Sequence, residues 1–217
     1  VKEAIVNYIA LLGWSPKSNV EKMSLAELVE HFSLEGINKS PAIFDEVKLK
    51  WLSGEYIKEM TDEEFASRAE PFFKQSKVYG KYDLLKIAAL LKTRIETFGE
   101  IANKINFLEE FGKYDLSLYT HKKMKTDEEI AKTVLPVARE KIAALKEFTF
   151  DSVHNAMTET VAQLGMKNGQ VFWCVRVAVT GKEATPGGVM EIAELIGKEE
   201  TLKRLDYSIA LLNGKEV

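Results

Sequence analysis

Apolar residues recur three or four positions apart along most of the chain, a spacing that places them on one face of an α-helix. Several of these apolar stripes follow a Ser or Thr that has a Glu three residues later, which is the pattern of a helix-capping box. The capping residues are Ser24, Thr61, Thr97 and Thr126. The pattern therefore predicts a mostly all-α protein.

Turn-forming residues mark where further helices begin and end. Ser40-Pro41 predicts the first turn of the helix that carries Trp51. The turn at 185–188, Thr-Pro-Gly-Gly, predicts the start of a helix near the C-terminus. Helix ends are predicted at Gly13, Ser53-Gly54, Gly165 and Gly197.

Residues 171–179 do not follow the helical pattern. They are rich in β-branched and aromatic residues, and this propensity favours a buried strand. An apolar run of this length is equally compatible with a buried helix, because periodicity does not separate the two in short segments. The sequence leaves both alternatives open.

Charge and composition exclude several classes of protein. The 217 residues carry 30 Lys and Arg against 33 Asp and Glu, a formal charge of −3, so any nucleic-acid contact surface must be local. No apolar run approaches the roughly 20 residues that cross a membrane, and the N-terminus has neither an initiator Met nor a secretory signal. The single cysteine, Cys174, fits a reducing compartment such as the cytoplasm. We expect part of a longer cytoplasmic protein with no membrane contact.

No catalytic or metal site emerges from the residues. His31, His121 and His154 are widely separated and match no metal-ligand spacing. Gly181-Lys182 lacks the glycine spacing and the following Ser or Thr of a phosphate-binding loop. Cys174 lies inside an apolar run, which favours a buried side chain over a nucleophile. We therefore expect no catalytic residue, no metal ligand and no cofactor in this chain.

Longer phrases of the sequence occur in the order of one known family. They are residues 3–16, 40–45, 48–51, 54–57, 169–173, 176–181, 185–188 and 197–202. Together these blocks resemble the C-terminal part of bacterial-type glutamyl-tRNA synthetase over nearly the whole chain. Residues 61–145 agree with the family in helical pattern more than in motif.

The resemblance implies a helical stem-contact segment at 1–60 and two anticodon-binding segments of the α-helix cage type, at 61–108 and 109–217. The parent enzyme is then a class I glutamate–tRNA ligase, which joins glutamate to tRNA through a glutamyl-adenylate, using ATP and magnesium. Its nucleotide-binding half precedes the part matched here, so we expect this chain to be inactive alone. Lys22-Met-Ser24 resembles the start of the family's KMSKS loop, but Ser24 is more simply a helix cap.

The resemblance also implies the residues that bind the anticodon. Arg94 matches the arginine that reads the third anticodon base, which goes with discrimination for glutamate tRNA. Arg176, Thr185 and Pro186 match the domain that reads the other two bases, and Val189 is a further candidate. An arginine suits this task because its planar guanidinium makes two parallel hydrogen bonds to one base or phosphate.

Plainer interpretations stand beside these assignments. Arg94 would otherwise be an arginine on a helix surface paired with Glu96 or a neighbour, and Thr185 a helix cap. Arg176 lies among valines, so its head must reach water or a partner in either case. Lys48 and Lys50 would contact tRNA phosphates, or would simply be solvated.

Two wider expectations complete the prediction. Trp51, Phe172 and Trp173 are suited to stack on bases, but large aromatics in apolar runs more often belong to the core. The expected partner of a monomeric protein is glutamate tRNA, not DNA. The alternative is an all-α protein-interaction module without RNA binding, which would dock a partner in its apolar grooves.

Overall fold

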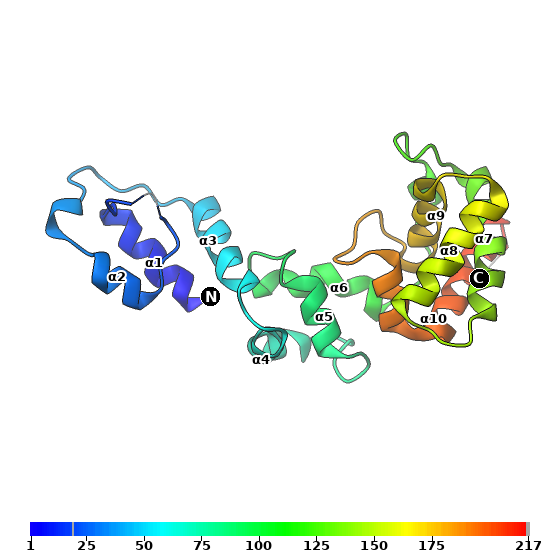
Figure 1. The fold of residues 1–217 in the computed structure, drawn as a ribbon, viewed down its shortest axis with the longest axis horizontal. Coiled ribbons are helices and arrows are strands. Elements are labelled where there is room, and N and C mark those ends of the chain that lie inside the picture. Colours follow the sequence, from blue (N-terminus) through cyan, green and yellow to red (C-terminus); the bar gives the residue numbers. More distant parts are fainter. Residues whose placement is uncertain (19, 216–217) are drawn as a thin grey trace. The chain divides into compact units, whose positions relative to one another are not determined.

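The computed structural model describes residues 1–18 and 20–215, and within them it contains α-helices and 3-10 helices but no β-strand (Figure 1). Two isolated bridges, Trp14 with Ile37 and His121 with Thr126, are the β-pairings of the described residues. The predicted all-α class is confirmed. The α-helices are α1 Lys2–Gly13, α2 Leu25–His31, α3 Glu46–Lys58, α4 Asp62–Phe73, α5 Leu84–Leu91, α6 Ile101–Glu109, α7 Glu128–Ala144, α8 Phe150–Leu164, α9 Asn168–Thr180 and α10 Val189–Leu212.

The chain divides into two compact units, each with its own packing. Unit 1 comprises Val1–Gln75 and Leu84–Ala102, and unit 2 comprises Ser76–Asp83 and Asn103–Val217. The 3-10 helices are η1 Leu34–Gly36, η2 Phe98–Glu100 and η3 Leu116–Tyr119.

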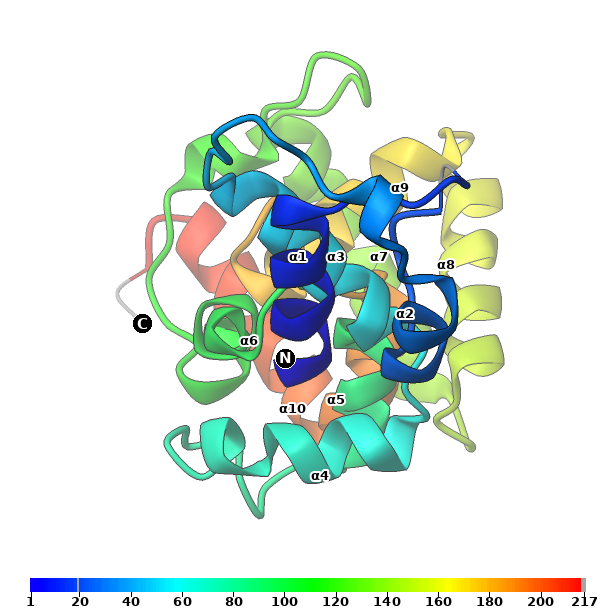
Figure 2. The same ribbon diagram turned by 90° about the vertical axis from the view of Figure 1, so that its left-hand side faces the viewer.

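Unit 1 is held by two small apolar clusters and a buried asparagine. α1 packs against α2 and α3, and α4 packs against α5 (Figure 2). The Asn7 side chain is fully buried on α1. Its Nδ2 donates to the Glu21 carbonyl at 2.9 Å, and its Oδ1 accepts from the Met23 backbone N–H at 2.8 Å. Asn7 thereby fastens the segment before α2 to α1, where few apolar side chains are available.

Four helix starts follow the predicted capping pattern. Three of them are predicted caps: Ser24, Thr61 and Thr97 each accept a hydrogen bond from the backbone N–H three residues later or form a capping box there. Thr149 caps α8 in the same way, with Ser152 in place of the glutamate. Gly165 ends α8 in the left-handed conformation, with φ of 63°. Gly197 (φ 81°) divides α10 into two helical segments, as the predicted stop implied.

Two predicted helix starts are wrong. The helix that carries Trp51 begins after Asp45, whose carboxylate accepts from the Lys48 backbone N–H at 3.0 Å, and not at Ser40-Pro41. Likewise Asp127 and not Thr126 caps α7, accepting from the Ile130 N–H at 2.9 Å. In both cases a carboxylate lies close by, and its negative charge favours the positive end of a helix.

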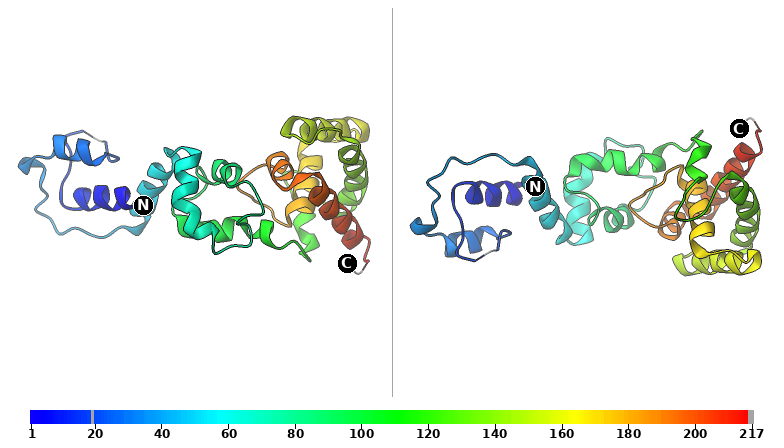
Figure 3. Two further views of the ribbon diagram at one scale, coloured as in Figure 1. Left: turned by 90° about the horizontal axis from the view of Figure 1, so that it is seen from below. Right: turned by 90° about the horizontal axis from the view of Figure 1, so that it is seen from above.

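The strand favoured by propensity at 171–179 is also wrong, because these residues belong to helix α9. Val171, Cys174, Val175, Val177 and Val179 are at most 1% exposed, since α7, α8 and α10 all pack against α9 (Figure 3). A helix that is buried on most of its surface has apolar residues on nearly every side, so its sequence is one continuous apolar run. Tertiary burial therefore outweighs the β-propensity of its valines.

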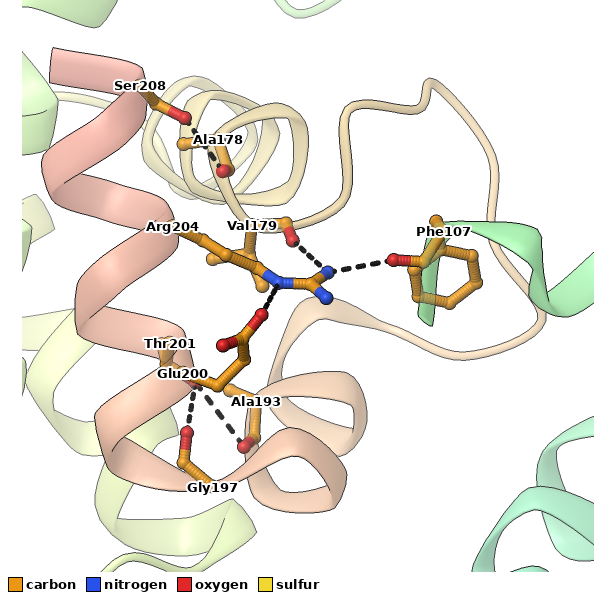
Figure 4. Close-up of polar contacts among 9 residues, drawn as sticks. All are labelled: Phe107, Ala178, Val179, Ala193, Gly197, Glu200, Thr201, Arg204 and Ser208. Carbon is orange, nitrogen blue, oxygen red and sulfur yellow. Dashed lines mark hydrogen bonds and ion pairs between the residues drawn. The ribbon is translucent and has the colours of Figure 1, made fainter. Parts of the chain in front are cut away.

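Unit 2 has a buried arginine at its centre. Arg204 on α10 is 1% exposed, and its Nη1 donates to the carbonyls of Phe107 and Val179 at 3.0 Å each (Figure 4). Its Nε donates to the Glu200 carboxylate at 2.8 Å, and its guanidinium lies 4.6 Å from the centre of the Phe111 ring. One side chain thus connects α10 with the ends of α6 and α9.

Replacing Arg204 by leucine leaves two buried carbonyls without a donor. We expect the unfolding free energy of unit 2 to fall by about 3 kcal/mol, the lower end of the range for breaking a buried charged contact. Urea unfolding followed by circular dichroism measures this loss. The matched control is Arg139→Leu, which breaks an exposed ion pair with Asp206 and should cost less than about 1 kcal/mol. Equal losses for the two variants would contradict the central role of Arg204.

Candidate functional site

Arg94 lies in the turn that follows α5, with its side chain exposed to solvent. Its backbone N–H donates to the Leu91 carbonyl at 2.7 Å, which closes the turn. Across the described residues the guanidinium has no hydrogen-bond or ion-pair partner, so its donors are free for a ligand. The alternative of a helix-surface arginine paired with Glu96 is wrong, because α5 ends at Leu91 and no such pair forms.

A pocket of about 300 Å³ brings Arg94 next to Trp51 of α3. The Trp51 ring is 41% exposed, although the sequence favoured a core position for it. Glu100 also lines the pocket, but its Oε1 accepts from the N–H groups of Glu96 and Thr97 and from the Thr97 hydroxyl. A flat aromatic surface and an unpaired guanidinium therefore share one opening.

The turn that carries Arg94 is fixed on both sides. Before it, the Lys92 ammonium pairs with the Asp62 carboxylate at 2.7 Å, and after it the Ile95 side chain is 2% exposed. Gly54 lets the turn approach α3, since a Cβ there would lie 3.3 Å from Glu96 Cγ. The predicted helix end at Ser53-Gly54 is therefore wrong: Gly54 lies within α3 and serves a close contact.

Arg176 extends from α9 to the surface of unit 2. Its side chain is half-buried, and Nη1 donates to the Glu183 carbonyl at 3.5 Å in the loop after the helix. The expectation that its head reaches a partner is confirmed. The helix ends at Gly181 with φ of 63°, so the loop at 181–188 folds back toward the arginine.

The turn at 185–188 differs from its predicted local role. Thr185 is not the helix cap, because α10 begins after Gly188 and the Thr185 hydroxyl donates to the Gly187 carbonyl at 2.7 Å. Pro186 is buried and Val189 is 2% exposed. The Glu191 carboxylate lies against Gly188, where an added Cβ would be 2.6 Å from its Oε2. A negative group already covers the first turn of α10, which disfavours a phosphate there.

Lys48 and Lys50 of α3 already have carboxylate partners. The Lys48 ammonium lies 2.6 Å from the Glu21 carboxylate, and the Lys50 ammonium lies 2.7 Å from that of Glu46. Hydrogen bonding to Glu46 raises the pKa of Lys50. Phosphate contact by either lysine would require exchange of these exposed pairs, which contribute little to stability.

Phe172 and Trp173 have structural roles. The Trp173 Nε1 donates to the Leu118 carbonyl at 3.0 Å, and its ring centre lies 4.2 Å from that of His121. The Phe172 ring packs edge-on against His154. The sequence favoured core positions for all three aromatics, and the exposure of Trp51 contradicts this. The available signal was its position near Lys48 and Lys50, on a helix with a polar outer face.

The part of the chain that the structure describes shows neither a metal-ligand group nor a membrane-spanning helix. No three His, Cys, Asp or Glu side chains there group in a way that would hold a metal ion. None of the described helices combines the length and apolarity needed to cross a bilayer. Cys174 is fully buried, and burial raises the pKa of its thiol to about 12.

Comparisons with known proteins show the family of the chain. Residues 64–209 match the model of the family described as "Anticodon binding domain". The chain belongs to this family, which covers about two thirds of its length.

Similar curated sequences identify one kind of enzyme, glutamate–tRNA ligase. The chain is 45% identical over 217 residues to the glutamate–tRNA ligase of Clostridium novyi (strain NT), and 49% identical over 214 residues to that of Lachnoclostridium phytofermentans. It covers 44% of the length of each of these curated relatives, in their C-terminal part. The resemblance found in the sequence is thereby confirmed.

Solved structures agree with this similarity. A glutamate tRNA ligase from Elizabethkingia meningosepticum, solved in complex with its amino acid, superposes with a TM-score of 0.83 at 28% identity. The match covers 97% of this chain and 41% of that one. The enzyme from Elizabethkingia anophelis gives a TM-score of 0.80 at 26% identity.

The Cys174 thiol should be unreactive in the folded chain. A pKa raised from 9.0 to about 12 lowers the thiolate fraction at pH 8 on the order of 1,000-fold, before burial blocks access. We expect iodoacetamide to label Cys174 slowly in buffer and rapidly in 6 M urea. Mass spectrometry of timed samples measures both rates. Similar rates in the two conditions would contradict the buried, neutral thiol.

Proposed function

We propose that this chain binds the anticodon arm of glutamate tRNA and forms the tRNA-recognition part of a glutamate–tRNA ligase. Its membership of the anticodon-binding family and the relatives' shared activity support this proposal. The observation that carries it is the pocket where the unpaired Arg94 guanidinium adjoins the exposed Trp51 ring. Single-stranded RNA bases are bound by this combination of stacking and edge recognition.

Trp51 and Arg94 have different roles in binding the base. The Trp51 ring offers a stacking surface that accepts any base, because every base has a π-face. The Arg94 guanidinium offers parallel donors to the edge of the third anticodon base and so rejects bases that lack the matching acceptors. Affinity therefore comes mainly from Trp51 and discrimination mainly from Arg94.

Unit 2 supplies the contacts with the other anticodon bases. Arg176 lies at the surface beside the turn at 185–188, and Thr185 is half-exposed there. The buried Pro186 and Val189 side chains hold this turn in shape and leave its backbone for contact. Lys48 and Lys50 add positioning contacts with tRNA phosphates after exchange of their carboxylate partners.

The remainder of the longer protein explains an unusual apolar surface on unit 1. Apart from Trp51, twelve large apolar side chains that are at least 46% exposed fall among the described residues of 5–47, more than an isolated soluble surface normally presents. We infer that the other half of the ligase packs against this surface. ATP and magnesium act there, so this chain alone does not attach glutamate. We further propose that the ligase acts as a monomer in the cytoplasm, where the one cysteine of this chain stays reduced.

Arg94→Ala should abolish discrimination at the third anticodon base. Fluorescence-anisotropy titration compares glutamate tRNA with a transcript altered at that base. We expect the wild-type chain to prefer the first about tenfold, or about 1.4 kcal/mol, the energy of one good bidentate contact. Arg94→Lys should retain affinity but lose the preference, because an ammonium lacks the fork geometry. Arg139→Ala removes the same charge outside the pocket and should preserve the preference. Equal binding of both tRNAs by the wild-type chain would refute the assignment.

Trp51→Ala should weaken the binding of both tRNAs by the same factor. Loss of one stacking surface costs about 1–3 kcal/mol, or roughly fivefold to 150-fold in Kd, whichever base is present. Trp51→Phe should restore most of the affinity, because it retains an aromatic face. The same titrations measure both variants. A change in base preference, or no change in affinity, would show that Trp51 does not stack on the base.

A further inference from the structure

A second polar pocket, of about 260 Å³, lies in unit 2 between the C-terminal ends of α6 and α9. Its walls come from the segment after α6, which includes Glu110 and Lys113, and from Thr180, Gly181 and Lys182. No residue matched to the anticodon by resemblance lines it. The pocket is too small for a folded partner but has room for one charged group of a nucleic acid.

The charges around this pocket do not cancel. Glu110, its one acidic wall residue, forms a close ion pair with Lys77, and this pairing lowers the pKa of Glu110. Lys113 and Lys182 are both exposed, and neither ammonium has a hydrogen-bond or ion-pair partner among the described residues. Two lysines without a partner thus line one opening, and the carboxylate among its described lining residues is already paired. This balance favours an anion.

The wall between the two lysines is rigid. The Tyr114 hydroxyl lies 2.7 Å from both the Tyr119 hydroxyl and the Ser208 Oγ, which holds the ring in place. Gly181, with φ of 63°, packs over that ring, and a Cβ there would lie 3.3 Å from Tyr114 Cδ1. The Lys182 backbone N–H is held in turn by the Thr180 hydroxyl at 3.1 Å. The backbone at Lys182 is therefore fixed before any ligand arrives.

The pocket and the proposed RNA surface of unit 2 share the loop that follows α9. Lys182 begins the loop whose next residue, Glu183, accepts the hydrogen bond from Arg176. The same loop leads to the turn at 185–188. A nucleotide bound at Arg176 would bring its neighbouring phosphate toward Lys182.

We propose that Lys113 and Lys182 bind one backbone phosphate of the tRNA anticodon loop. This inference rests on the proposed tRNA binding and adds two phosphate-positioning residues to it. Because a phosphate carries no sequence information, the pair contributes affinity and register without selecting a base. The bound phosphate releases counterions, so its contribution weakens as the salt concentration rises.

The test compares the double variant Lys113→Ala/Lys182→Ala with the control Lys104→Ala/Lys146→Ala. The control removes two exposed lysines of unit 2 that do not line the pocket. Anisotropy titrations with glutamate tRNA at several salt concentrations give Kd and its salt slope. We expect the pocket variant to bind about tenfold more weakly at low salt, with a slope shallower by about 0.7, as for one phosphate of single-stranded RNA. In the control variant, both the Kd and the salt slope should change much less than in the pocket variant.

Neutral phosphates locate the contact. In anticodon stem-loops that carry a single methylphosphonate, one position should weaken binding to the wild-type chain and have no further effect on the pocket variant. Equal Kd and slope for the pocket and control variants would overturn the phosphate site, while a preserved Arg94-dependent preference would leave the proposed function intact. A pocket variant with a lower melting temperature but an unchanged Kd would also overturn the phosphate site, because the two lysines would then stabilise the fold without binding tRNA. Absence of tRNA binding by the wild-type chain would refute both proposals.

Discussion

Unit 2 depends on a cation that has been removed from water. The Arg204 guanidinium is buried, and its position is acceptable only because two backbone carbonyls, a carboxylate and an aromatic face surround it. Those carbonyls belong to Phe107 of α6 and Val179 of α9, near the points where both helices end. The same arginine that satisfies the core therefore sets where the two following segments leave the helices, and the second polar pocket lies between these segments.

Unit 1 solves a different problem, because its candidate base-binding side chains must remain uncovered. The close approach of the turn at 92–96 to α3 keeps these side chains exposed at a small cost in stability. Without a side chain at Gly54, the turn at 92–96 rests directly on α3, and the buried Ile95 holds it there. Arg94, one residue earlier, is left exposed beside Trp51. A glycine in the middle of a helix costs roughly 1 kcal/mol in stability, and here it permits the close packing that aligns the two side chains.

Local patterns allowed much of the helical organisation to be predicted, including the capping residues Ser24, Thr61 and Thr97. The errors have two causes, one local and one tertiary. At Asp45 and Asp127 a nearby carboxylate replaced the expected cap, and at α9 contact with three neighbouring helices replaced the expected strand. Short-range propensity contributes tenths of a kcal/mol per residue, and tertiary contacts readily exceed it.

The sequence by itself determined the helical class and the family, because periodicity and the order of motifs are properties of the chain alone. The resemblance also named Arg94 and Arg176 as candidates to read bases. Only the tertiary structure decided which of those side chains are free. It left Arg94 without a partner, gave Lys48 and Lys50 carboxylates, exposed Trp51 and enclosed Trp173. The physical reason is that a side chain's availability to a ligand depends on residues distant in sequence that compete for the same hydrogen bonds and the same surface.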